Sequence, residues 1–98
     1  MNIIMNKDNT VLTVSLEGRL DTTTAPQLES ELMANLPGKT DLILDFEKLE
    51  YISSAGLRVL LQSQKTMNKQ GTMKVINVNE TIAEVFEITG FNDILTIE

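Results

Sequence analysis

The sequence predicts an α/β domain in which helices pack on a mixed β-sheet. In the second half of the chain, short strand-like segments, the first of them an apolar run over residues 41–46 bracketed by carboxylates, are separated by stretches whose apolar residues recur three or four positions apart, as on one face of a helix. The first two strand-like stretches have only a short polar turn between them. The expected order is therefore β-β-α-β-α-β-α-β, an N-terminal hairpin followed by parallel β-α-β units with right-handed crossovers.

The hairpin is expected at the start of the chain. Every second residue from 12 to 16 is a leucine or valine, which indicates a strand over residues 11–16 with one buried face. Residues 3–5 form a shorter strand before it, and residues 6–9 are polar turn formers. Residues 18–21 are expected to break the second strand.

The first helix is expected to follow residues 22–24, three threonines whose hydroxyl groups can cap it. Pro26 suits its first turn, because proline lacks the N–H that the first turn leaves unpaired. Leucines four residues apart form its inner face. The residues on or beside this face are Ala25, Leu28, Leu32, Met33 and Leu36. Pro37 and Gly38 end the helix.

Three strands and two further helices are expected in the second half. In order, these are a central strand over residues 41–46 that leads out through residues 49–52, a helix over 55–67, a strand over 73–78, a helix over 82–89 ended by Gly90, and a short strand over 94–97. In the first of these helices Leu57, Leu60 and Leu61 mark the inner face, and Val59 lies on its flank.

Composition narrows the classes of function. The 98 residues are expected to form a single domain over residues 1–98. The absence of cysteine and histidine excludes zinc fingers, thiol catalysis and an imidazole base. The net charge of −6 disfavours nucleic acid and anionic lipid, and favours a protein partner with basic contacts. Because no long apolar segment or secretion signal is visible, we expect a cytoplasmic protein that does not contact a membrane.

A strand-to-helix corner between residues 45 and 57 is the most informative feature. Ser53 and Ser54 open the helix, and the small residues Ala55 and Gly56 follow them. The free N–H groups of a first helical turn favour an anion there, and small residues are expected to leave this backbone uncovered for another molecule. The alternative interpretation is purely structural, with Ser53 or Ser54 serving as the N-cap of the helix.

Enzymatic interpretations have less support in the sequence. A catalytic serine would lack a histidine partner, and no Gly-x-Ser-x-Gly elbow is present. Asp21 and Asp45, both expected at strand ends, could hold Mg²⁺, but solvated or capping carboxylates are the favoured interpretation because no loop is dense in oxygen ligands. No Gly-rich phosphate cradle occurs either. We therefore expect no enzymatic activity, no cofactor and no metal site.

The sequence resembles the STAS family, the domain shared by bacterial anti-sigma factor antagonists and the cytoplasmic tails of sulfate transporters. The likeness covers nearly the whole chain, and three segments carry it. They are Gly18-Arg19-Leu20-Asp21 followed by Thr24-Ala25-Pro26, then Asp45-Phe46 with Leu49, Tyr51 and Ile52, and finally Ser53-Ser54-Ala55-Gly56-Leu57-Arg58-Val59-Leu60. As a free-standing domain, the chain looks like an antagonist rather than a transporter tail.

The resemblance implies a switch between partners. In the family, the unphosphorylated antagonist binds an anti-sigma factor that is also a serine kinase, which frees the sigma factor, and phosphorylation reverses this binding. The family's acceptor serine aligns with Ser54, and Ser53, which occupies the position of the family's aspartate, is the second candidate. The residues expected to contact the partner are Asp21, Thr22, Thr23, Ser53, Ser54, Ala55, Gly56, Leu57 and Arg58. A phosphatase that resets the switch is a further expected partner.

The sequence leaves two roles open for Asp21 and more than one function open for the domain. Asp21 either helps to shape the site near Ser54 or only caps the loop before the first helix. The whole domain could instead be a constitutive docking subunit of a lipid-transport or signalling complex. A small hydrolase that uses Ser54 and the carboxylates at the strand ends is a third interpretation.

Overall fold

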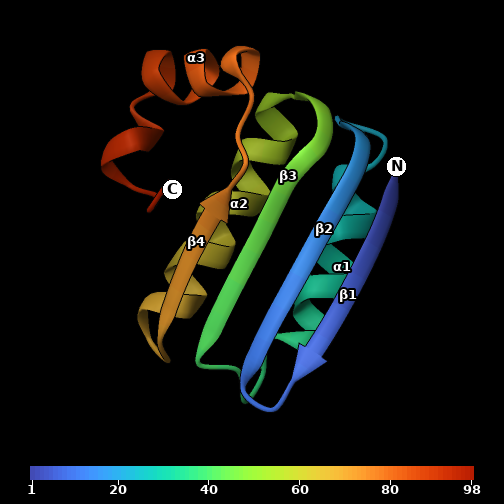
Figure 1. Ribbon diagram of the computed structural model, residues 1–98, viewed down its shortest axis with the longest axis vertical. Coiled ribbons are helices and arrows are strands. Elements are labelled where there is room, and N and C mark those ends of the chain that lie inside the picture. The colour runs from blue at the N-terminus through green and yellow to red at the C-terminus, as the bar shows by residue number, and fades with distance from the viewer.

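A single four-stranded sheet organises the chain in the computed structural model, which describes residues 1–98 (Figure 1). In chain order the elements are β1 (Asn2–Asp8), β2 (Val11–Leu20), α1 (Ala25–Asn35), β3 (Asp41–Ile52), α2 (Ser54–Asn68), β4 (Thr72–Ile76), α3 (Glu80–Thr89) and a short 3₁₀ helix η1 (Phe91–Asp93). The strands lie side by side in the order β1-β2-β3-β4. β1 is antiparallel to β2 and the other pairings are parallel, which confirms the expected mixed α/β class.

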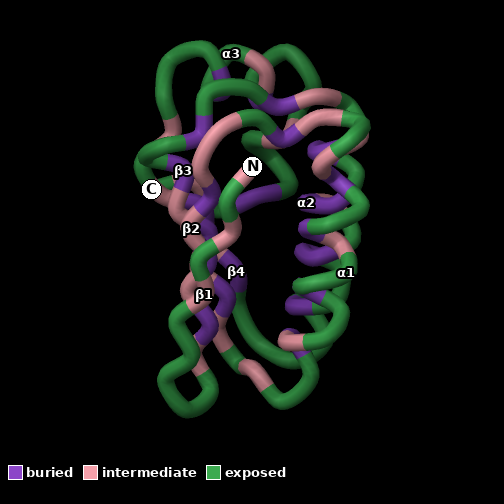
Figure 2. Tube along the Cα trace, turned by 90° about the vertical axis from the view of Figure 1, so that its right-hand side faces the viewer, coloured by how far each residue is buried: buried purple, intermediate pink, exposed green.

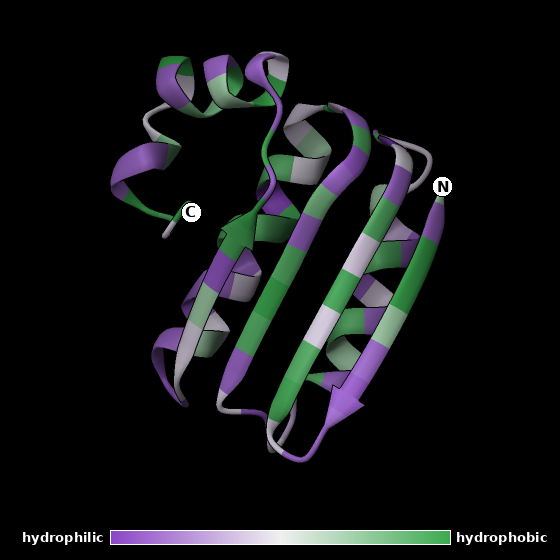
Figure 3. Ribbon diagram, in the orientation of Figure 1, coloured by the Kyte–Doolittle hydropathy of each residue, from purple (hydrophilic) through white to green (hydrophobic).

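Helices α1 and α2 cover one face of the sheet, so the domain has two layers (Figure 2). Every second residue is buried in β4 and in the first parts of β2 and β3, up to Leu16 and Phe46, and bands of hydrophobic residues along β2 follow this alternation (Figure 3). Helix α3 lies at the end of the sheet where β3 ends, and the ring of its Phe86 packs 6.4 Å from the ring of Phe46. None of the three helices combines the length and apolarity that crossing a membrane requires.

Both central strands are longer than the sequence pattern predicts. β2 continues through Gly18 to Leu20 instead of breaking there, and β3 runs for twelve residues to Ile52 instead of ending at residue 46. Register shifts between Ser15 and Glu17, and again at Gly18, let the two strands stay paired while local alternation is lost. The expected loop over residues 47–52 is therefore strand, and only Ser53 separates β3 from α2.

The turns and the C-terminus also differ from expectation. The hairpin turn is tight, because β1 extends to Asp8 and pairs there with Val11, and Asn9 takes a left-handed φ of 54°. β4 stops at Ile76, since Asn77 has a φ of 59°. The expected last strand is reduced to a single bridge between Ile97 and Val75.

The inner faces of the first two helices are buried as predicted except at single positions. Met33, expected beside the core, is 70% exposed on α1. On α2, Val59 is buried while Leu61 is only half-buried, the reverse of the predicted assignment. Both differences arise because α1 and α2 pack against each other as well as against the sheet, so each helix buries a face set by two neighbours.

Candidate functional site

The starts of α1 and α2 lie together at the end of the sheet where β2 and β3 both finish (Figure 1). Leu20 and Ile52, the last residues of these strands, are paired in register. The N–H of Ser53 donates to the carbonyl oxygen of Leu20 at 2.9 Å. The parallel pairing thus brings Asp21, which follows β2, beside Ser53, which follows β3. We call this arrangement, residues 21–24 with residues 53–58, the corner.

Ser53 is the N-cap of α2. Its backbone is extended, with φ −99° and ψ 176°, and its Oγ accepts a hydrogen bond from the N–H of Gly56 at 3.4 Å. The capping interpretation is therefore confirmed for Ser53. Ser54, the first residue of the helix, is exposed, and none of the side-chain hydrogen bonds of the chain involves its hydroxyl. The two serines therefore differ, because Ser53 caps the helix and the hydroxyl of Ser54 is exposed without a hydrogen-bond partner.

Gly56 and Leu57 face the core, so the expectation that small residues leave the backbone at Gly56 uncovered is wrong. Gly56 is buried against Leu20 and Ile52, and a Cβ at this position would lie 2.7 Å from Leu20 Cγ and 2.8 Å from Ile52 Cγ1. Leu57 is only 7% exposed. The missing side chain lets α2 approach the sheet closely and so sets the position of Ser54.

The outward surface of the corner is polar. Ser54 and Arg58 are exposed on α2, and Ser53 and Ala55 are half-buried beside them. Before α1, Thr22 and Thr23 are exposed and Asp21 is half-buried. The structure thus brings together seven of the nine residues that were expected to contact a partner, with the other two beneath them.

Asp21 holds the turn between β2 and α1. Its Oδ1 accepts hydrogen bonds from the Thr23 hydroxyl at 2.8 Å, the Thr23 N–H at 3.0 Å and the Thr24 N–H at 3.2 Å. The Asp21 N–H donates to the Thr24 hydroxyl at 2.8 Å, and that hydroxyl donates to the Arg19 carbonyl oxygen at 2.8 Å. The pKa of Asp21 lies below its ordinary value of 3.8, and the largest cause is the hydrogen bond from the Thr23 hydroxyl. Asp21 therefore does cap this turn, whereas Thr24 makes no side-chain cap to α1.

Asp21 is expected to stabilise the fold only while its carboxyl group is ionised. Because its pKa is lower in the folded chain than the ordinary 3.8, this contribution is complete above about pH 5 and is lost as the pH falls through 3.8 toward the folded value. Asp21→Asn should lower the free energy of unfolding at neutral pH, and the difference from the unchanged chain should shrink in acid. Urea denaturation between about pH 3 and pH 7 measures this.

The control for this prediction is Asp8→Asn. Asp8 is exposed at the end of β1 and accepts no side-chain hydrogen bond. A pH-dependent loss of the same size in both variants would contradict a special role for the Asp21 turn.

Arg19 and Tyr51 form a pair at the corner that sequence reasoning did not identify as a contact. The Arg19 guanidinium lies 4.3 Å from the centre of the Tyr51 ring, and its Nε is 3.9 Å from Asp21 Oδ2. Both residues belong to the motifs that carry the family resemblance, but their contact depends on the register that pairs Arg19 with Tyr51. The only signal in the sequence was their position near the ends of two strands.

Asp45 does not belong to the corner. It lies inside β3, paired with Ser15, about 20 Å along the strand from Ile52. Its Oδ1 accepts hydrogen bonds from the N–H of Glu47 and the Nδ2 of Asn77, each at 3.0 Å. The expectation that Asp21 and Asp45 lie at one edge of the sheet is thus wrong, because β3 continues past the apolar run that predicted its end.

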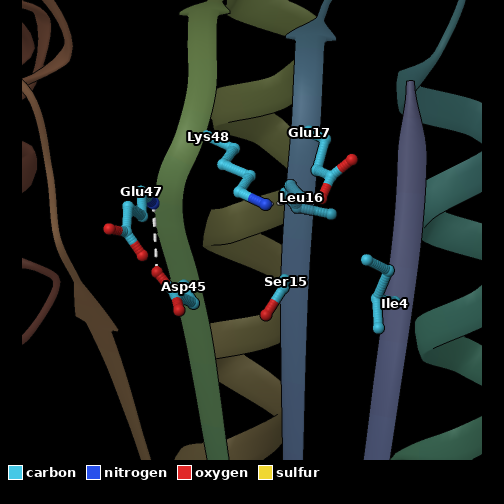
Figure 4. A pocket seen from close by; sticks show the side chains of 7 residues that line it. All are labelled: Ile4, Ser15, Leu16, Glu17, Asp45, Glu47 and Lys48. Atoms are coloured by element: carbon cyan, nitrogen blue, oxygen red, sulfur yellow. Dashed lines mark hydrogen bonds and ion pairs between the residues drawn. The ribbon is translucent and has the colours of Figure 1, made fainter.

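Asp45 instead lines a shallow hollow on the face of the sheet that the helices leave open (Figure 4). Across it, the Nζ of Lys48 pairs with Glu17 Oε2 at 3.5 Å. The remaining lining residues are Ile4, Ser15, Leu16 and Glu47. No group of three or more acidic side chains is arranged to hold a metal ion, here or elsewhere in the chain.

Comparisons with known proteins agree with this architecture. BtrV of Bordetella bronchiseptica, which bears the name of an anti-sigma factor antagonist, is 38% identical over 99 residues, 99% of this chain and 85% of its own length. An anti-sigma-B factor antagonist of Bacillus subtilis is 30% identical over 98 residues, 99% of this chain and 90% of its own. Unphosphorylated SpoIIAA, a solved anti-sigma factor antagonist, covers 99% of this chain and 87% of its own with a TM-score of 0.79 at 18% identity.

A solved structure of the phosphorylated form of SpoIIAA, a Bacillus cell fate determinant, has the same fold, with a TM-score of 0.78 at 19% identity over 99% of this chain and 91% of its own. The family model for the STAS domain matches residues 2–98. With that match over almost its whole length, the chain belongs to the STAS domain family.

Proposed function

We propose that this chain is an anti-sigma factor antagonist that acts in the cytoplasm and is regulated by phosphorylation of Ser54. In the unphosphorylated state it binds an anti-sigma factor that is also a serine kinase, and so frees a sigma factor. The names of the relatives support the first part. The observation that carries the second part is the hydroxyl of Ser54, which is exposed at the start of α2 and free of hydrogen bonds while Ser53 caps the helix.

A phosphate on Ser54 would fit the helix without unfolding it. The first turn of a helix has unpaired N–H groups and the positive end of the helix dipole, both of which stabilise an anion. The modification would take the net charge from −6 to about −8, and all of the added charge would lie on the corner. The fold would stay the same while the surface offered to a partner changed.

In the transfer, this chain supplies only the nucleophile. The Oγ of Ser54 forms a bond to the γ-phosphorus of ATP, the bond from that phosphorus to the bridging oxygen breaks, and ADP leaves. The hydroxyl proton passes to a base on the kinase, which also supplies the Mg²⁺. The chain itself is a substrate and catalyses no reaction in this scheme, and a phosphatase returns Ser54 to its hydroxyl form by hydrolysis.

The partner is expected to contact the exposed and half-buried residues around Ser54. These are Asp21, Thr22, Thr23, Ser53, Ala55 and Arg58. Gly56 and Leu57 contribute from below by holding α2 against the sheet. The phosphate would stand at the centre of this surface, where contact with a partner would remove it from water.

The direct test is incubation of the chain with its cognate kinase and ATP, followed by mapping of the phosphate by mass spectrometry. We expect one phosphate on Ser54 in the unchanged chain and none in Ser54→Ala. The control is Ser53→Ala, which removes the cap but leaves the acceptor in place. A phosphate that remains in Ser54→Ala, or maps to Ser53 in the unchanged chain, would overturn the assignment of the acceptor.

A further inference from the structure

The two arginines of the chain, Arg19 and Arg58, are in different states. Arg19 is already engaged, because its guanidinium lies over the Tyr51 ring and its Nε approaches Asp21 Oδ2 at 3.9 Å. Arg58 is exposed on α2 and takes part in none of the three ion pairs of the structure or its side-chain hydrogen bonds. The corner therefore contains one unpaired guanidinium.

Arg58 stands four residues after Ser54, which is one helical turn along the same face of α2. Side chains on a helix lean toward its N-terminus, so a long side chain at the later position covers the turn where the earlier one sits. An acidic group four residues before a basic one is also the favoured direction for such a pair, because it agrees with the helix dipole. The Arg58 side chain thus has the position and length to reach a group on Ser54 Oγ.

We propose that Arg58 pairs with the phosphate of phosphorylated Ser54 within α2, so that modification also withdraws this arginine from the partner-facing surface. The inference rests on the proposed function, since it requires Ser54 to be the acceptor. Guanidinium binds phosphate through two parallel charge-assisted hydrogen bonds, which makes arginine better suited to this contact than lysine. Phosphorylation then alters the corner twice, by adding a dianion and by occupying its one free guanidinium.

Other charged groups near the corner have partners or lie farther away. The Asp21 carboxylate is held by the hydroxyl and N–H of Thr23 and faces Arg19. Lys65, the next basic residue on α2, is about 16 Å farther along the helix axis than Ser54. Lys65 therefore offers a matched control, because its loss changes the net charge equally from the same helix.

The first experiment places phosphoserine at position 54 during translation, so that no kinase is needed. The Nε–Hε signals of Arg19 and Arg58 are then compared by NMR with those of the unmodified chain. We expect a large shift of the Arg58 signal and a small one for Arg19. An Arg58 signal that stays in place, or moves no more than that of Arg19, would overturn the inference.

The second experiment titrates the phosphate of the same protein by phosphorus NMR. A neighbouring guanidinium favours the dianion, so Arg58→Gln should raise the second pKa of the phosphate, by roughly 0.2–0.4 if the pair has the strength of ordinary helix ion pairs. Lys65→Gln should change it much less, and Arg58→Lys should restore part of the effect. Equal responses of Arg58→Gln and Lys65→Gln would contradict a specific pair.

A failure of this inference can be distinguished from a failure of the proposed function. A missing Arg58 response would remove the inference while kinase modification and partner release could still hold. A kinase that modifies another residue would contradict the proposed function. The NMR result on the phosphoserine protein would still show whether Arg58 pairs with a phosphate at position 54.

Discussion

Ser54→Glu is expected to weaken binding to the anti-sigma factor about a hundredfold, whereas Ser54→Ala should bind as the unchanged chain does. The added carboxylate stands on an exposed position at the centre of the corner, beside the Asp21 turn. A partner that covers this carboxylate must remove it from water without offering a cation of its own, and this costs about 3 kcal/mol. Isothermal titration calorimetry with the cognate anti-sigma factor measures the difference.

The matched control for this prediction is Ser30→Glu. Ser30 is an exposed serine on α1, so the same replacement adds the same charge to the chain outside the corner. We expect it to leave the dissociation constant nearly unchanged, because exposed charges farther apart than about 10 Å are largely screened. Similar losses in both variants would mean that overall charge, not the corner, controls binding.

Gly71→Ala should produce the largest loss of stability among simple replacements at the glycines. A Cβ on Gly71 would overlap the carbonyl oxygen of Thr40 and would lie 2.8 Å from the Cα of Thr40. These are backbone atoms at the start of β3, and the same oxygen accepts a hydrogen bond from Thr72 N–H at 2.9 Å, so neither segment can move without breaking the pairing of β3 with β4. We expect a loss of about 3 kcal/mol in the free energy of unfolding, measured by urea denaturation.

Gly56→Ala is the comparison for this loss. Its nearest atoms, Leu20 Cγ and Ile52 Cγ1, belong to side chains, which can adjust more easily than the backbone of Thr40. We expect a smaller loss, about 1–2 kcal/mol, together with weaker partner binding because the start of α2 is displaced. Gly71 follows the C-terminal end of α2, away from the corner. Gly71→Ala should therefore bind the partner with unchanged affinity under conditions in which the variant is folded. A reversed order of the two losses would show that the corner is the more rigid region.

Helices and strands were predictable from the sequence where the local spacing of apolar residues determines the type of element. Alternation in β2 and the spacing of leucines in α1 identify a strand and a helix, because each pattern reflects one buried face. Gly90 ends α3 as predicted, since it takes a left-handed φ of 79° that other residues adopt at a cost. The parallel order of the later strands followed from the helices between them.

The candidate site was predictable in part. The grouping of Ser53 and Ser54 at the start of a helix was visible because one short segment contains both. The contact of Arg19 with Tyr51, and the distance of Asp45 from the corner, were not visible. The contact depends on the register of β2 against β3, and the two register shifts that set it have no clear signal in either strand alone. The distance of Asp45 depends on the length of β3, which continues to Ile52 beyond its apolar run.

Taken by itself, the sequence determined a mixed α/β fold, the absence of histidine and cysteine, and the small, hydroxyl-bearing residues at the start of the second helix. Only the tertiary structure decided that Ser53 is the cap, that the Ser54 hydroxyl is exposed without a hydrogen-bond partner, and that Gly56 packs against Leu20 and Ile52. The physical reason is that periodicity reports which face of an element avoids water, whereas the neighbours of a residue on that face depend on strand register and helix packing across the whole chain.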